Sequence, residues 1–181
     1  MSYFSCMDMI EALKGDVNDK ATYLDYGYFG ILRAEFDEDG RSTGEYSPKP
    51  SYYVLQNICS VFAEDFKVCK QPILISPRHS DKIYEMQLGG SDIISGSFER
   101  PGGNAYVYWN PTNIMTTSYE ATITIQFYSK YDKIRLIDIM DGSVYEIPDN
   151  MIEKSGDGVY LIEELPIKDT PLILTFGDFL I

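Results

Sequence analysis

The chain contains few of the residues that build metal and redox sites. Among its 181 residues there are one tryptophan, one histidine, His79, and three cysteines. A zinc centre takes four ligands from cysteine, histidine and carboxylate side chains, and Cys6, Cys59 and Cys69 do not have the spacing of such a centre. We therefore expect no metal, no other cofactor and three reduced, buried thiols.

Positive charge is also scarce. Lysine and arginine total 15 against 28 aspartate and glutamate residues, which gives a formal net charge of −13 at pH 7. This charge repels phosphate backbones and anionic lipids, so nucleic-acid and membrane partners are disfavoured. Met1 is followed by no basic segment or cleavage site of a signal peptide, and no apolar run reaches the length of a membrane span. We expect a soluble protein, and both the cytoplasm and secretion stay open.

Tyrosine, in contrast, is abundant, with 15 residues beside 9 phenylalanines, and aromatic residues favour β structure. From Lys70 onward, short apolar runs alternate with glycine- and proline-containing turns at a spacing of roughly ten residues. The run "ATITIQF" alternates with period two, and "IMDGSVYEI" predicts a hairpin with an Asp-Gly turn. The predicted fold class is mainly β, with an antiparallel β-sandwich over residues 69–181.

Residues 1–68 have a different pattern. We expect a strand over residues 1–10, a long turn-rich loop and a helix over residues 48–64. The helix has an apolar stripe at helical spacing, formed by Leu55, Ile58 and Phe62. One strand followed by one helix is a single βα unit, and such units normally occur in series, as in a (β/α)8 barrel.

The segment "YGYFGILRAEFDEDGRSTGEYSPKPSYYVLQNICSVF" resembles the end of the catalytic barrel in a large group of glycoside hydrolases. In those enzymes a "GLL"-like segment follows the last strand, here Gly30-Ile31-Leu32, and a "KPSYYALQNL"-like helix closes the barrel, here Lys49 to Ile58. A β-sandwich often follows. It carries a "YW.P" strand, here Tyr108 to Pro111, and a "KDTPLLLTF"-like final strand, here within Pro166 to Phe176.

The resemblance implies the C-terminal part of a (β/α)8-barrel glycoside hydrolase. Residues 1–68 would be the last strand, loop and closing helix of the barrel, and residues 69–181 a sandwich that braces it. Hydrolysis of a glycosidic bond takes two carboxyl groups on opposite sides of that bond. In the family these lie at the ends of the fourth and seventh strands, upstream of Met1. No catalytic residue is therefore transferred to this chain, which alone is expected to be inactive.

The same resemblance implies carbohydrate contacts near the end of the expected strand. The family often carries an aromatic residue there, commonly tryptophan, to stack on a sugar ring, and Tyr3 and Phe4 take that place here. Asp8 would face the cleft of the intact enzyme, because the C-terminal ends of barrel strands form the active site. The alternative role of Asp8 is that of a loop cap.

Two other functions stay open. A stand-alone carbohydrate-binding module would need no catalytic pair and would use Trp109 and Tyr108 as a sugar platform. Strand alternation places Tyr106 and Tyr108 on one face and Val107 and Trp109 on the other, so burial of the tyrosine face would count against this role. An interaction domain unrelated to sugars is the third possibility. A Ser-His-Asp site is disfavoured because His79 lies in "SPRHSD", which has no nucleophile-elbow motif.

Separated from a barrel, the first part of the chain would expose apolar surface. Unpaired strand edges template pairing with other chains. We therefore expect self-association through residues 1–35 and the helix 48–64, or else a conformation of residues 1–35 that differs from that of the family.

Overall fold

The fold is mainly β. The computed structural model describes residues 6–12, 24–27, 29–38, 41–63, 65–70, 73–78, 93–111 and 121–180. These residues form antiparallel sheets of six and four strands, two two-stranded sheets and one α-helix, and no sheet among them closes into a barrel. The predicted fold class is confirmed. No helix in these ranges is long and apolar enough to cross a membrane.

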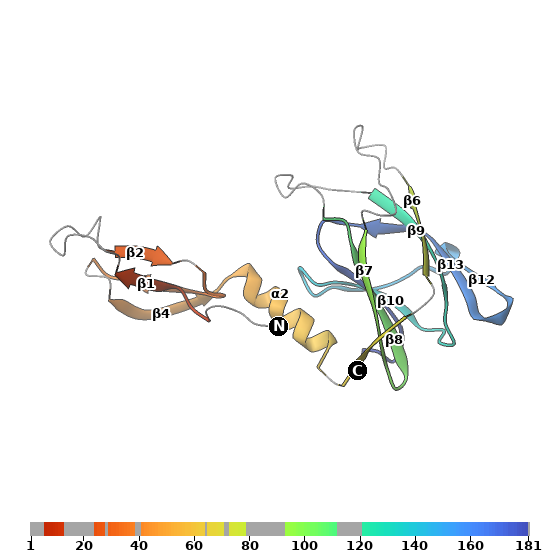
Figure 1. The fold of residues 1–181 in the computed structure, drawn as a ribbon, viewed down its shortest axis with the longest axis horizontal. Coiled ribbons are helices and arrows are strands. Elements are labelled where there is room, and N and C mark those ends of the chain that lie inside the picture. Colours follow the sequence, from red (N-terminus) through yellow and green to blue (C-terminus); the bar gives the residue numbers. More distant parts are fainter. Residues whose placement is uncertain are drawn as a thin grey trace. The chain divides into compact units, whose positions relative to one another are not determined.

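Two compact units divide the chain, residues 1–56 and residues 57–181, and the division falls inside the helix. The first unit contains four short strands: β1 (Met9–Ala12), β2 (Leu24–Gly27), β3 (Leu32–Phe36) and β4 (Ser42–Pro48). The pair β1–β2 is antiparallel (Figure 1), and so is the pair β3–β4. Met7 and Leu32 form an isolated parallel bridge, with hydrogen bonds of 3.0 Å from Asp8 N to Leu32 O and from Leu32 N to Cys6 O.

The first unit differs from the sequence-based expectation. Residues expected to form a turn-rich loop form the β3–β4 hairpin instead. Asp37 closes its turn, because Arg41 N donates to Asp37 Oδ1 at 2.8 Å and Asp37 N donates to Arg41 O at 2.9 Å. Every residue of β4 is exposed, so its sequence has no apolar alternation by which a strand could be recognised.

The predicted helix is confirmed with tighter bounds, as α2 (Pro50–Val61). Its first residue is proline, which suits this position because the first N–H of a helix has no intrahelical partner. The chain entering α2 is held by a 2.9 Å hydrogen bond from Lys49 N to Ile31 O. The helix ends with a 3.0 Å hydrogen bond from Phe62 N to Ile58 O.

Two antiparallel sheets form the second unit (Figure 1). The larger has the order β11 (Val144–Glu146), β10 (Ile134–Asp138), β14 (Leu172–Gly177), β8 (Gly103–Trp109), β7 (Ile94–Arg100) and β5 (Lys67–Cys69). The smaller has the order β12 (Ile152–Ser155), β13 (Val159–Ile167), β9 (Ala121–Tyr128) and β6 (Ile73–Arg78). Two short 3-10 turns flank β12: η2 (Asp149–Met151) and η3 (Gly156–Gly158).

The core of the second unit lies between these two sheets. Buried side chains from both contribute to one cluster, in which the rings of Phe127 and Phe176 lie 4.3 Å apart. The Tyr108 hydroxyl crosses between the sheets and donates to Pro166 O at 3.0 Å. The predicted sandwich and the predicted hairpin at the Asp-Gly turn, here β10–β11, are confirmed. The sandwich begins slightly before the predicted boundary after residue 68, because β5 pairs with β7. The division of the chain into a barrel part and a sandwich part stays a prediction.

Gly177 provides a test of this architecture. Its φ is +68°, and an added Cβ would lie 2.4 Å from Gly102 O and 2.8 Å from Tyr131 Cγ. We expect Gly177→Ala to lower the free energy of unfolding by about 1–3 kcal/mol, because the left-handed backbone is strained with a side chain and the neighbours must move. Urea denaturation measures this change.

Gly156→Ala is the matched control. No described atom lies within 4 Å of a Cβ added at Gly156, and its φ is outside the left-handed region. This variant should keep the wild-type unfolding midpoint or raise it slightly. Equal midpoints for the two variants would contradict the packing described around Gly177.

Candidate functional site

Three residues were expected to contact the substrate: Tyr3, Phe4 and Asp8. Tyr3 and Phe4 lie outside the described residues, so only the surroundings of Asp8 can be given. Its side chain is 3% exposed. Asp8 comes just before β1 instead of ending a strand over residues 1–10, as the sequence had suggested. The bridge between Met7 and Leu32 fixes the backbone here, and Asp8 N donates to Leu32 O.

One oxygen of the Asp8 carboxylate joins three separate segments. Oδ1 accepts a hydrogen bond from Gly30 N at 3.1 Å and one from Lys49 Nζ at 2.5 Å. A side chain at position 30 would not fit, because an added Cβ would lie 2.1 Å from the carbonyl carbon of Met7. Glycine therefore allows this amide to reach the carboxylate, and Lys49, just before α2, supplies the opposite charge.

The second oxygen, Oδ2, is buried and accepts no hydrogen bond within the described part of the chain. Burial of a charged oxygen without a donor is costly, and native structures contain few such groups. Asp8 thus acts as a cap through Oδ1, and the Ala34 N–H also lowers the pKa of its carboxyl group. Both roles considered from the sequence, loop cap and substrate contact, are compatible with this geometry.

The ionisation state of Asp8 follows from these contacts. Burial raises the pKa of its carboxyl group, but the Lys49 ammonium and the Gly30 N–H lower it by more, so the pKa lies below its usual value. At neutral pH Asp8 is a carboxylate that accepts hydrogen bonds, and it has no proton to donate as a general acid. Within the described ranges, no group of three or more histidine, cysteine, aspartate or glutamate side chains could hold a metal ion. The expected burial of the three thiols is wrong, because Cys6 and Cys59 are exposed and Cys69 is half-buried.

Tyr108 and Trp109, the residues of the alternative sugar platform, lie on opposite faces of β8. Tyr106 and Tyr108 are 4% and 0% exposed, their rings are stacked 5.8 Å apart, and burial raises the pKa of Tyr108. Trp109 is half-buried on the outer face of the sheet with Val107. The expected alternation is confirmed, and burial of the tyrosines counts against a platform there. The binding role itself stays a prediction.

The outer face of the larger sheet carries an apolar pocket of about 400 Å³, beneath the C-terminal end of α2. Its walls include Ile58, Phe62, Phe98, Val107, Trp109 and Ile173. The ring of Phe62 lies 5.1 Å from that of Phe98 and 5.8 Å from that of Phe179. Asn57 Nδ2 also donates to Ile139 O at 2.9 Å. Residues 57–62 are therefore fixed to the sandwich by apolar packing and by one hydrogen bond.

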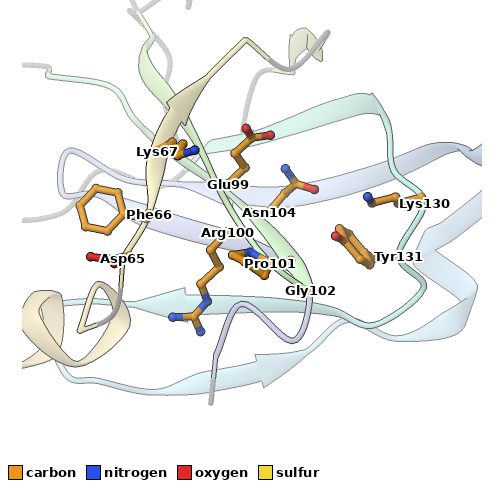
Figure 2. A pocket seen from close by; sticks show the side chains of 11 residues that line it. Asp65, Phe66, Lys67, Glu99, Arg100, Pro101, Gly102, Asn104, Lys130 and Tyr131 are labelled. Atoms are coloured by element: carbon orange, nitrogen blue, oxygen red, sulfur yellow. The ribbon is translucent and has the colours of Figure 1, made fainter.

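A larger and more polar cleft, of about 760 Å³, lies at the β5 end of the same sheet. Figure 2 shows Glu99 and Asn104 between Lys67 on one side and Lys130 with Tyr131 on the other. Sequence reasoning missed this cleft. The residues are far apart in the chain, and the signal that joins them is the register of β5, β7 and β8, which the sequence does not reveal.

Comparison with known proteins identifies no family, since no protein-family model and no curated protein matches the chain. The chain is a mainly antiparallel β protein with one short α-helix among its described residues.

The ion pair between Asp8 and Lys49 can be tested by substitution. Lys49→Met would leave a buried carboxylate without its counter-charge, which costs up to about 3–5 kcal/mol in proteins. We expect faster hydrogen exchange at the amides of Gly30 and Leu32. Lys133→Met is the matched control, because Lys133 and Asp178 form an exposed pair at 3.3 Å. Exposed pairs contribute about 0–1 kcal/mol, so the control should leave the exchange of both amides unchanged.

Acidification tests the same carboxylate. Because the pKa of Asp8 is lower in the folded chain than in the unfolded chain, its stabilising contribution is complete above the unfolded value of 3.8 and is lost as the pH falls through the folded value. The Gly30 amide resonance should therefore titrate with a midpoint below 3.8. A midpoint above it, or the same titration in Asp8→Asn, would contradict the assignment.

Proposed function

We propose that this chain is the C-terminal part of a glycoside hydrolase, in which the β-sandwich braces a (β/α)8 barrel and carries no catalytic acid pair. The proposal starts from the resemblance of Gly30-Ile31-Leu32 and of Lys49 to Ile58 to the end of such a barrel. In this proposal α2 is the closing helix, and the carbohydrate is bound by the parent enzyme. The chain alone is not catalytic.

The observation that carries the bracing role is the attachment of residues 57–62 to the sandwich. Phe62 packs on Phe98 and Phe179, and Asn57 hydrogen-bonds Ile139 O. Gly142, in the same turn as Ile139, has a φ of +77° and allows Asn57 to approach, since an added Cβ would lie 2.9 Å from Asn57 Oδ1. These contacts fix the C-terminal end of the helix to the sandwich, as the proposed bracing role requires.

Asp8 has a consistent place in this proposal. Its ionised carboxylate uses Oδ1 to join Gly30 and Lys49, and leaves Oδ2 for a hydroxyl of a bound sugar or for a donor from the rest of the barrel. The rival role, a carbohydrate-binding module that uses Trp109 and Tyr108, is weakened by the burial of Tyr108.

The reading frame upstream of the Met1 codon gives the most direct test. It should encode the preceding strands and helices of a barrel, with carboxylates at the ends of the fourth and seventh strands. An upstream sequence that encodes no such barrel would contradict the proposal. A stop codon and a promoter directly upstream would also contradict it, unless the sequence beyond them still encodes remnants of a barrel.

Activity gives a second test, using the 181-residue chain itself. We expect no hydrolysis of aryl glycosides above the rate in buffer, because the two acids on which the mechanism depends belong to strands outside this chain. Release of nitrophenol from a panel of nitrophenyl glycosides measures this. Turnover that is abolished by Asp8→Asn or Glu35→Gln would show instead that an active site lies within the chain.

A further inference from the structure

The polar cleft at the β5 end of the larger sheet, called the edge cleft below, is built on one row of residues. Lys67 on β5 lies directly opposite Glu99 on β7, and Glu99 lies directly opposite Asn104 on β8. Directly opposed residues of antiparallel strands share a face of the sheet, with Cβ atoms about 4.5–5.5 Å apart. The row therefore presents an ammonium, a carboxylate and an amide side by side (Figure 2).

This row lies on the inner face of the sandwich. Asn104 is opposite Phe176 on β14, and Phe176 is a fully buried core residue. Toward the β5 edge the same face becomes polar and open, because Asn104 is half-buried while Glu99 and Lys67 are exposed. A polar inner face is unusual, since the inner faces of a sandwich normally form its apolar core. The exposed polar end of the row is thus available to a ligand.

The opposite wall is held rigidly. Tyr131 lies in the loop after β9, where Tyr131 N donates to Ser129 Oγ at 3.0 Å and Ser129 Oγ donates to Tyr131 O at 3.2 Å. The Tyr131 ring packs against Gly177, which has no side chain to displace it. The Lys130 ammonium lies 5.1 Å from the ring centroid on a long, exposed side chain that can move aside. A wall fixed before binding lowers the entropy lost when a ligand binds.

Lys67 and Glu99 have free hydrogen-bonding capacity within the described residues, whereas the Asn104 amide already hydrogen-bonds the Cys69 thiol and keeps only its remaining donor and acceptor sites. Neither Lys67 nor Glu99 forms a salt bridge with another residue of the described chain. Cys69, on the same face, offers no thiolate at neutral pH: burial and the nearby charge of Glu99 raise the pKa of its thiol by more than the Asn104 hydrogen bond lowers it. The edge cleft is therefore equipped to bind a polar molecule through hydrogen bonds and has no activated nucleophile in Cys69.

The charges of the row select the class of ligand. The charges of Lys67 and Glu99 offset each other, and the chain as a whole carries −13, so an anion gains little here. A carboxylate accepts hydrogen bonds from hydroxyls, an ammonium donates to oxygen, and an amide does both. Saccharides combine these features: they carry hydroxyl donors and oxygen acceptors on neighbouring carbons, and their C–H groups can pack against an aromatic ring.

We propose that the edge cleft binds a neutral saccharide. Glu99 accepts hydrogen bonds from its hydroxyls, Lys67 and Asn104 donate to its oxygens, and Tyr131 contacts its C–H groups. A volume of about 760 Å³ is in the range of small-molecule sites, about 300–1,000 Å³. This site is separate from Trp109 and Tyr108. It does not rest on the hydrolase proposal, because it uses the sandwich alone.

The test is a titration of the isotope-labelled full chain with xylobiose, cellobiose, maltose and lactose, followed by amide NMR shifts. We expect at least one of these sugars to give saturable shifts at Glu99, Asn104 and Tyr131, with a Kd of about 1 mM or tighter. Glu99→Gln removes the charged acceptor and should weaken binding by about tenfold or more, the usual effect of one hydrogen bond to a charged group.

Glu146→Gln is the matched control, the same substitution on β11 at the opposite edge of the same sheet. It should leave the Kd unchanged, and the unfolding midpoints of both variants should equal that of the wild type. Absence of saturable shifts with all four sugars would overturn the proposal, and so would equal effects of the two substitutions. Tighter binding of glucuronic acid than of glucose would overturn the assignment of a neutral ligand.

Discussion

Burial of apolar side chains between two antiparallel sheets is the interaction on which the second unit depends. Each fully buried large side chain contributes about 1.5–3 kcal/mol, and both sheets supply several: Ile123, Ile125, Phe127, Ile162, Leu165, Leu174 and Phe176. Two tyrosine hydroxyls of the layer are hydrogen-bonded. The Tyr108 hydroxyl reaches Pro166 O, and the Tyr160 hydroxyl donates to Asp132, which also accepts from Lys154.

The outer face of the larger sheet also packs against apolar side chains, those of residues 57–62. Alternation along β8 sends Tyr106 and Tyr108 inward, and sends Val107 and Trp109 toward Ile58 and Phe62. One strand thereby serves two apolar layers. The single tryptophan is then accounted for by packing.

Some of this could be predicted from the sequence because the signals are local. The period-two pattern of residues 121–127 and the Asp-Gly turn of "IMDGSVYEI" each depend on a few adjacent residues, and both were confirmed. The β3–β4 hairpin was missed because β4 is exposed throughout and has no apolar period. The row of Lys67, Glu99 and Asn104 could not be found, because it is created by strand register between distant segments.

The same limit applies to Asp8. Its position near the end of an expected strand drew attention to it, but nothing local indicates that residues 30 and 49 would donate to its Oδ1. Contacts across 22 and 41 residues are properties of the folded chain. The loop residue Asp132 gives a second example, because its donors Lys154 and Tyr160 lie 22 and 28 residues away along the chain.

Because Tyr131 fits closely against Gly177, the two sides of the edge cleft differ in how well they tolerate substitution. Lys67 and Glu99 are exposed, and their side chains could be exchanged one at a time without disturbing the core. Gly177 leaves room for the ring through its backbone conformation and Ser129 fixes the loop through its hydroxyl, so replacement of either would alter the sandwich itself. In evolutionary terms, this scaffold could acquire a new ligand preference by single substitutions along the row, while the aromatic wall would be inherited with the fold.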